Sequence, residues 1–368
     1  MENAPRQGTL HLSGPSCTHF IIQLPRERCV INRDNSFDLI RHLAALAVLV
    51  SHHYVLSGQQ EPMLQGYNSL GAIAVLAFFA ISGFLITQSF LNTRSFYHYM
   101  EKRIARIFPA LIGCAFVMVY LCGPAFSTNG LGYAFSLESL TDFLKVSAFG
   151  RADIGDITST FIFKDSFNGS LWSLKIEFGC YVLLALALLV LRRAAVPLII
   201  ALAFCITTYL CSTSAHPMAP KLLVYSTVGI VFFVGSSLYF YRAAFSSVKA
   251  KLLIGVLSAA LVLVSLNTPL VMVFASIGVS LLVLSLGTLC KDRIIKSRFD
   301  ISYGMYLYAF PVQQLMINTT ALSFYASMLA TVAVVIVLAS LSWLFIEKPA
   351  LNYVHRRSRH QESAATMA

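Results

Sequence analysis

The chain has 368 residues, of which 57% are hydrophobic and only 12% are charged, whereas soluble domains carry about 25% charged residues. This composition excludes an ordinary soluble domain and indicates a protein embedded in lipid. The formal net charge of +11 would suit nucleic acid or an anionic surface, but the positions of the basic residues indicate membrane topology instead.

Residues 1–36 are polar and lack the apolar core and cleavage site of a secretory signal, so we expect a cytoplasmic tail. After them, ten stretches are long and apolar enough to predict transmembrane helices. They cover residues 37–57, 69–91, 107–124, 171–191, 195–211, 222–242, 250–266, 268–290, 301–322 and 325–346. Residues 37–350 are thus predicted to form one all-α membrane domain with a long loop at 125–170, followed by a second tail, residues 351–368.

The basic residues alternate between the two sides of these helices. Of the 27 lysines and arginines, 21 fall in the two tails and in the loops that follow even-numbered helices, and four fall on the opposite side. Loops rich in Lys and Arg face the cytoplasm. Both termini are therefore predicted to be cytoplasmic and the 125–170 loop extracytoplasmic, with membrane lipids and no nucleic acid as partners.

Ionisable residues inside predicted membrane helices are costly and by default mark a functional site. In the first helix, Arg41 and His52 are eleven residues apart, which places them on nearly the same face and about 16 Å apart along the axis. Plainer interpretations are that Arg41 extends its charge to the interface and that His52 lies at a helix end.

Glu177 lies roughly 10 Å into the fourth predicted helix from its outer end, at a depth similar to that of His52. A carboxylate at that depth needs a partner. A pair with His52 would orient the imidazole as a general base acting on a hydroxyl. Lys175, nearer the outer rim, is the alternative partner for Glu177.

Arg103 and Arg106 precede the third helix and are one helical turn apart, so both guanidinium groups can face the same place. Arginine binds phosphate through its planar fork; the alternative is ordinary positive charge beside a membrane helix. With Arg41, they would hold the phosphates of a long donor at the cytoplasmic side while its thioester reaches His52. Acyl-coenzyme A has that shape.

The ninth predicted helix contains Tyr303, Tyr306 and Pro311, which is typical of a bent helix that faces a polar cavity. An aromatic belt at the membrane interface explains Tyr303 equally well. These tyrosines and Trp172 are candidate hydrogen-bond donors to an oxyanion. None of the eight cysteines belongs to a C-x-x-C pair, and no metal site is expected.

Six short motifs follow one another along the chain. They are Asp38-x-x-Arg41 with His52, Phe79-x-Ile81-Ser82-Gly83-Phe84-Leu85-Ile86, Lys102-Arg103-x-x-Arg106-Ile107-x-Pro109, Asn168-Gly169-Ser170-Leu171-Trp172-Ser173-Leu174-x-x-Glu177, Ile301-Ser302-Tyr303-Gly304-x-Tyr306-Leu307 and Ile346-Glu347-Lys348-Pro349-Ala350. In these motifs and their order, the sequence resembles the acyltransferase 3 family of integral-membrane acyltransferases over about residues 37–350. It departs from the family at Ala309, where many members have a histidine.

The resemblance implies an O-acyltransferase of the bacterial inner membrane, with acyl-coenzyme A, usually acetyl-coenzyme A, as co-substrate. It implies an acceptor hydroxyl on an extracytoplasmic or lipid-linked glycan such as O-antigen or exopolysaccharide. By this likeness His52 is the base, Glu177 a supporting carboxylate, and Arg41, Arg103 and Arg106 the donor-binding set.

Some alternatives stay open at the level of sequence. Transfer can be direct or pass through an acylated His52. A transporter or flippase for a glycan or small molecule would also have about ten spans and buried charges. The sequence specifies neither the sugar, nor the length of the acyl group, nor the oligomeric state.

Overall fold

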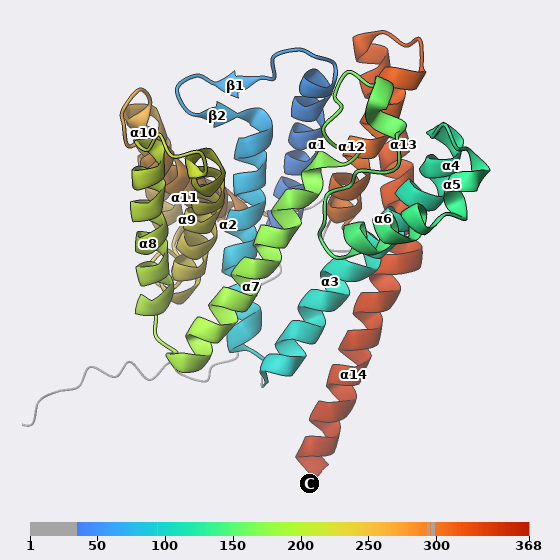
Figure 1. Ribbon diagram of the computed structural model, residues 1–368. Coiled ribbons are helices and arrows are strands. Elements are labelled where there is room, and N and C mark those ends of the chain that lie inside the picture. The colour runs from blue at the N-terminus through green and yellow to red at the C-terminus, as the bar shows by residue number, and fades with distance from the viewer. Residues whose placement is uncertain (1–34, 94, 293–294, 296–298, 368) are drawn as a thin grey trace, which may run out of the picture. The chain divides into compact units, whose positions relative to one another are not determined.

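The computed structural model describes residues 35–93, 95–292, 295 and 299–367, with side chains as far as residue 357 (Figure 1). The predicted N-terminal tail, residues 1–36, lies almost wholly outside the described residues. Four of the basic loop residues also lie outside them, namely Arg94, Arg293, Lys296 and Arg298.

The described chain is built almost entirely from helices. The long ones are α1 (Phe37–Leu56), α2 (Leu70–Leu91), α3 (Phe96–Phe116), α7 (Trp172–Val190), α8 (Ala195–Ser212), α9 (Ala219–Phe240), α10 (Val248–Ser265), α11 (Val271–Leu289), α12 (Ser302–Thr319), α13 (Phe324–Ser342) and α14 (Lys348–Met367). Short π-helical stretches, η1 (Val117–Cys122) and η4 (Trp343–Glu347), follow α3 and α13.

The remaining elements are small. A hairpin of β1 (Met63–Leu64) and β2 (Asn68–Ser69) joins α1 to α2. Between α3 and α7 lie α4 (Gly123–Phe126), α5 (Leu131–Ala134), α6 (Leu137–Ser147) and the 3-10 turns η2 (Ile157–Thr160) and η3 (Gly169–Leu171).

Several helix starts follow directly from the sequence. Ser69, Ser95, Ser136 and Ser247 stand immediately before α2, α3, α6 and α10, and each side chain accepts a hydrogen bond from the backbone N–H three residues on. Such serines satisfy one of the N–H groups that a helix leaves unpaired at its first turn. The polar breaks between apolar runs therefore act as specific start signals.

Within the described residues, nine helices are long and apolar enough to cross a membrane, which confirms the all-α membrane class. The tenth predicted span, 301–322, does form a helix, α12, but it is not among these nine. Gln313 and Gln314 are completely buried in it, because α1, α13 and η3 pack around it. Neighbouring protein, rather than lipid, surrounds its polar residues.

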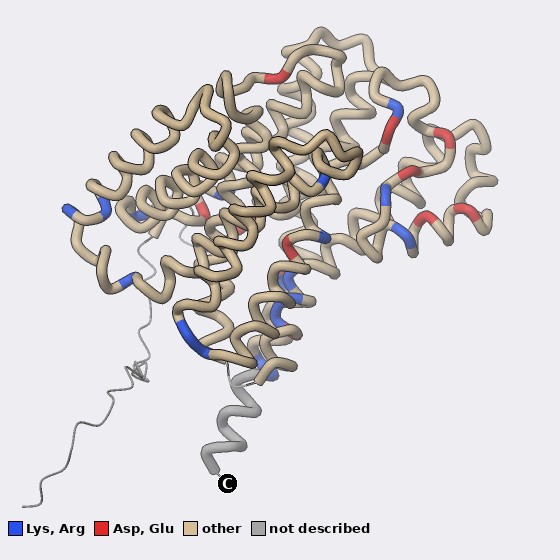
Figure 2. The backbone as a smooth tube through the Cα atoms, turned by 60° about the vertical axis from the view of Figure 1, so that its left-hand side comes forward, with Lys and Arg blue, Asp and Glu red and all other residues tan. Residues whose placement is uncertain are grey.

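Two helices extend beyond their predicted ends. The third begins at Phe96 rather than near residue 107, so Arg103 and Arg106 lie on α3 itself and not in a loop. The last predicted span continues through η4 into α14, so residues 351–367 of the predicted tail are helical. Most Lys and Arg positions gather at the end of the bundle from which α14 extends (Figure 2).

The helices pack in two groups around α2. On one side, α9 and α11 contact α2, with α8 and α10 beyond them; on the other, α1 packs against α2 and α12, and α13 covers α12 (Figure 1). Helices α3 and α7 run beside these groups and contact each other and α2. Ser82 of α2 thus faces α7, where it donates to Glu177.

The 125–170 segment is not simply an external loop. Helix α6 packs along α3, and the ring of Phe149, just after α6, lies 5.0 Å from that of Phe108 and 5.8 Å from that of Phe178. At its end, the buried Asn168 donates to the carbonyl of Leu307 in the middle of α12 at 3.0 Å. The segment therefore reaches into the helix bundle before α7 begins.

Helices α2 and α9 approach at two glycines. A Cβ atom on Gly83 would lie 1.9 Å from the carbonyl oxygen of Phe232, and one on Gly235 would lie 2.4 Å from that of Ala80. Small residues allow this kind of backbone contact between membrane helices. Beside it, the hydroxyl of Thr87 donates to Ser236 at 2.7 Å.

Gly83→Ala is expected to force α2 and α9 apart and to destabilise the protein by about 1–3 kcal/mol. Thermal unfolding of the purified protein in detergent measures this. Gly179→Ala is the matched control, because a Cβ on Gly179 in α7 meets nothing within 4 Å. Equal unfolding temperatures for the two variants would contradict the role of this contact.

Candidate functional site

A cavity of about 380 Å³ lies between α1, α2, α3, α7, α12 and the η4–α14 connection. Its charged lining combines four cations and three carboxylates, namely Arg41, Lys102, Arg103, Arg106, Asp38, Glu177 and Asp300. Its apolar lining includes Phe78, Phe79, Leu174 and Trp343. Six of the eight predicted site residues therefore line this cavity, namely Arg41, Arg103, Arg106, Glu177, Tyr303 and Tyr306. His52 and Trp172 do not line it.

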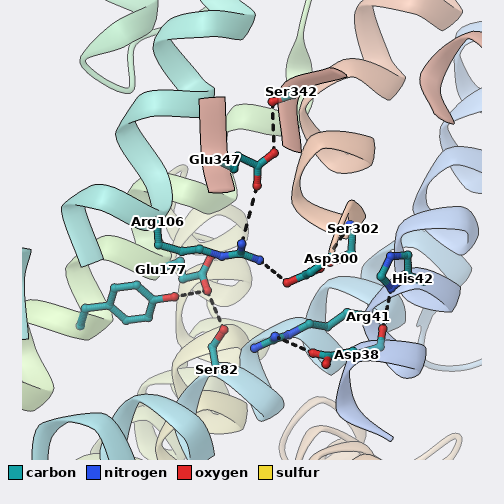
Figure 3. Close-up of polar contacts among 11 residues, drawn as sticks. Asp38, Arg41, His42, Ser82, Arg106, Glu177, Asp300, Ser302, Ser342 and Glu347 are labelled. Atoms are coloured by element: carbon teal, nitrogen blue, oxygen red, sulfur yellow. Dashed lines mark hydrogen bonds and ion pairs between the residues drawn. The ribbon is translucent and has the colours of Figure 1, made fainter. Parts of the chain in front are cut away.

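Arg106 is held between two carboxylates, as Figure 3 shows. Its Nη2 lies 2.6 Å from Oδ2 of Asp300 and its Nη1 lies 3.6 Å from Oε2 of Glu347. The hydroxyl of Ser302 donates to Asp300 at 2.6 Å, and that of Ser342 donates to Glu347 at 3.1 Å. The network joins α3 to the start of α12 and to η4.

Asp300 stands outside the nine apolar helices, just before α12. Burial opposes its ionisation, but the charges of Arg106 and Arg41 and the hydrogen bond from Ser302 together outweigh burial and hold the pKa of this carboxyl below its usual value. Asp300 therefore stays a carboxylate at neutral pH. Since Arg106 is also close to Glu347, its own charge is largely compensated by protein groups.

Arg103 has a different environment, although it is less than one turn from Arg106. Its Nη2 donates to Ser89 at 3.3 Å, and its guanidinium lies 5.8 Å and 6.0 Å from the ring centres of Tyr99 and Tyr181. Its buried Nε has no hydrogen-bond partner, and within the described residues no carboxylate forms an ion pair with it. Its Nε donor is thus available to an anionic ligand.

Arg41 lines the cavity from α1. Its Nη1 lies 3.5 Å from Oδ1 of Asp38, one turn earlier, and both side chains are only partly exposed. Figure 3 places this pair beside the Arg106 network. At 3.5 Å and with solvent access, the pair is weak, so a stronger anion can compete for the guanidinium.

Glu177 accepts hydrogen bonds from the hydroxyls of Ser82, at 2.6 Å, and Tyr181. The predicted contact between Glu177 and His52 is therefore wrong, and so is the alternative pair with Lys175, since neither is formed and Lys175 is exposed. We expected the fourth predicted helix, which corresponds to α7, to start at the outer surface of the membrane. In the structure, α7 starts next to the middle of α12. Because α7 starts this deep, Glu177 lies further from the outer surface than its position in the sequence predicted.

His52 lies on α1 with its ring 5.2 Å from that of Phe310, and its Nδ1 is buried without a hydrogen-bond partner in the described part of the chain. Phe310 is one turn along α12 from Tyr306, which lines the cavity. Gly169 lets Phe310 approach, because a Cβ there would lie 2.9 Å from the ring. His52 therefore does not line the cavity but lies beside Phe310, one helical turn along α12 from the lining residue Tyr306.

The neighbouring His53 is a structural residue. It is completely buried, and its Nε2 lies 3.1 Å from both the Phe324 carbonyl oxygen and the Ser327 hydroxyl. These contacts tie α1 to α13. The two adjacent histidines therefore differ in that His53 is fully engaged and His52 is not.

The three candidate oxyanion donors are either hydrogen-bonded within the protein or located away from the cavity. The hydroxyl of Tyr303 donates to the Ile107 carbonyl, and that of Tyr306 donates to the Ser170 carbonyl, both at 2.9 Å. Trp172 is 38% exposed and stacks on Tyr225 with ring centres 6.3 Å apart, away from the cavity. No group of His, Cys, Asp or Glu within the described ranges is arranged to hold a metal ion.

Sequence reasoning missed Asp300 and Glu347 as partners of Arg106, and Ser82 and Tyr181 as partners of Glu177. A signal did exist for the first pair. Any arginine inside a membrane helix needs compensation, and Asp300 and Glu347 are the acidic residues that flank the last two predicted spans. The hydroxyl partners of Glu177 give no comparable signal, because serine and tyrosine are frequent in these helices.

Comparisons with known proteins agree with this architecture. The family described as "Acyltransferase domain" matches residues 34–347. An "O-acetyl transferase" of Shigella phage Sf6 is 37% identical over 86% of this chain and 96% of its own length. "Nodulation protein 10" of Rhizobium leguminosarum bv. viciae is 28% identical over 86% of this chain and 93% of its own length.

No solved structure matches the chain significantly. The family match nevertheless spans the cavity-lining helices other than α14, and Arg41, His52, Arg103, Arg106 and Glu177 lie within the matched range. The chain therefore belongs to this family of membrane acyltransferases, the acyltransferase 3 family, and is an acyltransferase.

Proposed function

We propose that the chain is an O-acetyltransferase that moves an acetyl group from cytoplasmic acetyl-coenzyme A to a hydroxyl of an extracytoplasmic or lipid-linked glycan, in the bacterial inner membrane. The observation that carries the proposal is the cavity, in which cations from two helices, α1 and α3, converge while the Nε of Arg103 has no acceptor among the described residues. A buried donor without an acceptor is costly. An anionic ligand would relieve that cost.

The donor's phosphates would bind where Arg41, Lys102 and Arg103 line the cavity. Arginine and lysine hold phosphate oxygens by charge-assisted hydrogen bonds. Arg106 has a supporting role in this proposal, because Asp300 and Glu347 already occupy its donors. Glu177 interacts electrostatically with Arg103 and would limit the excess positive charge.

The reactive end of the donor would extend along α1 and α12 toward His52, past Tyr306 and Phe310. The His52 imidazole would take the proton of the acceptor hydroxyl, and the oxygen would attack the thioester carbonyl. The new C–O bond replaces the C–S bond, and the thiolate leaves and is protonated from the imidazolium. The hydroxyls of Tyr303 and Tyr306 are engaged with backbone carbonyls, so we assign the oxyanion to neither.

His52→Ala is expected to lower glycan acetylation by at least about 100-fold, because it removes the base, while membrane insertion and thermal stability are kept. Mass spectrometry of the glycan with acetyl-coenzyme A as donor measures this. His216→Ala, in the exposed turn before α9, is the matched control and should keep activity. Full activity of His52→Ala would remove His52 from the mechanism.

Arg103→Ala should raise the KM for acetyl-coenzyme A about 10-fold or more, the usual loss for a charged hydrogen bond. The unfolding temperature of this variant should change little. Arg103→Lys keeps the charge but lacks the planar fork of the guanidinium. Its KM for acetyl-coenzyme A should lie between the values of the natural protein and of Arg103→Ala. Arg356→Ala, exposed on α14, is the control. An unchanged KM in Arg103→Ala would mean that this arginine only marks topology.

Arg106→Ala should act mainly on stability, because it leaves Asp300 and Glu347 buried without their cation, at a cost of roughly 3–5 kcal/mol. Removing the Asp300 charge in the same chain, as Asp300→Asn, should recover part of the lost unfolding temperature. A stable Arg106→Ala protein with a raised donor KM would instead place Arg106 in direct contact with the donor.

A further inference from the structure

Trp343 is a cavity residue to which neither the motifs nor the proposed mechanism gives a role. It is the first residue of the π-helical turn η4 and lines the cavity, and only 8% of its surface is exposed. Its indole N–H has no hydrogen-bond partner among the described residues. Buried N–H groups in folded proteins nearly always have an acceptor, so this one calls for a physical explanation.

The surroundings explain why the protein supplies no acceptor. Trp343 belongs to a packed apolar cluster that contains Ala45 and Leu49 of α1, Met305 of α12 and Ala339 of α13. The π-helical turn widens the helix at this point, and such turns are frequent at functional sites. The same turn carries Glu347, whose carboxylate compensates Arg106. One widened turn thus holds a charged group and an unused neutral donor.

The position of Trp343 fits the course that the proposed function assigns to the donor, from the cationic end of the cavity toward His52. Along α1, Arg41 lines the cavity, Ala45 and Leu49 pack in the cluster that contains Trp343, and His52 follows one turn later. Trp343 therefore lies beside the part of α1 that connects the cationic end to the histidine. In the proposed function, a donor that extends from Arg41 to His52 would run along this part of α1 and therefore near the indole.

We propose that the indole N–H of Trp343 donates a hydrogen bond to a carbonyl oxygen in the amide-bearing arm of the acyl donor. The inference rests on the proposed function and extends it from the phosphates to the arm. A neutral donor among apolar side chains suits a neutral acceptor, because an amide carbonyl costs far less to desolvate than a phosphate. The phosphates are better held at Arg41 and Arg103, where the charges are.

Trp343→Phe keeps the aromatic ring but removes the N–H. It is expected to raise the KM for acetyl-coenzyme A about 3- to 10-fold, as for one neutral hydrogen bond, with kcat nearly unchanged. Phe345→Leu, at an exposed side chain of the same turn that does not line the cavity, should keep the donor KM. An unchanged donor KM in Trp343→Phe would overturn the inference.

Intrinsic fluorescence gives a second test that does not depend on the folding of Trp343→Phe. The chain has only two tryptophans, so the Trp172→Phe variant has Trp343 as its single indole. Adding coenzyme A should change its emission with saturation, whereas Trp343→Phe, which keeps only Trp172, should not respond. Absence of a saturable change in the Trp172→Phe variant would overturn the inference even if Trp343→Phe had a raised KM.

The two proposals fail in different ways. If the natural protein acetylates glycan from acetyl-coenzyme A but the fluorescence of Trp343 does not change when coenzyme A is added, the inference about the amide-bearing arm of the donor is wrong. The proposed function then stands. If the natural protein neither binds coenzyme A nor acetylates glycan, the proposed function itself is wrong.

Discussion

The guanidinium of Arg106 lies between the carboxylates of Asp300 and Glu347, which come from segments far apart in the chain. Charges in a low-dielectric interior are tolerated only when paired and hydrogen-bonded, and Ser302 and Ser342 supply the further hydrogen bonds. This network fixes α3 against the start of α12 and against η4. Because it holds α3 in place, it also fixes the position of the neighbouring Arg103, whose Nε has no hydrogen-bond partner among the described residues.

The second constraint is the close contact of α2 with α9. Gly83 permits this contact, while the residue before it, Ser82, turns toward the cavity and donates to Glu177. Successive helical residues point about 100° apart, so one short motif serves both faces of α2. The packed group of α8 to α11 therefore supports one wall of the cavity without contributing lining residues to it.

The deep start of α7 separates the acidic and imidazole groups. Asn168 donates to Leu307, and Tyr306 donates to Ser170, so the chain enters α7 beside the middle of α12. Glu177 is consequently part of the cationic cavity, and His52 stays near Phe310 without a carboxylate. In our proposal the donor's phosphates and its acyl group are held by these two separate regions, with Trp343 along the way.

The sequence by itself determined the membrane class, most of the helices and which side chains are costly to bury, because hydropathy, capping serines and charge depend only on nearby residues. It also indicated the family through its ordered motifs. Only the tertiary structure decided the partners: Arg106 with Asp300 and Glu347, Glu177 with Ser82 and Tyr181, and the enclosure of α12 by protein. These depend on the depth and rotation of each helix, which are set by packing between segments distant in sequence.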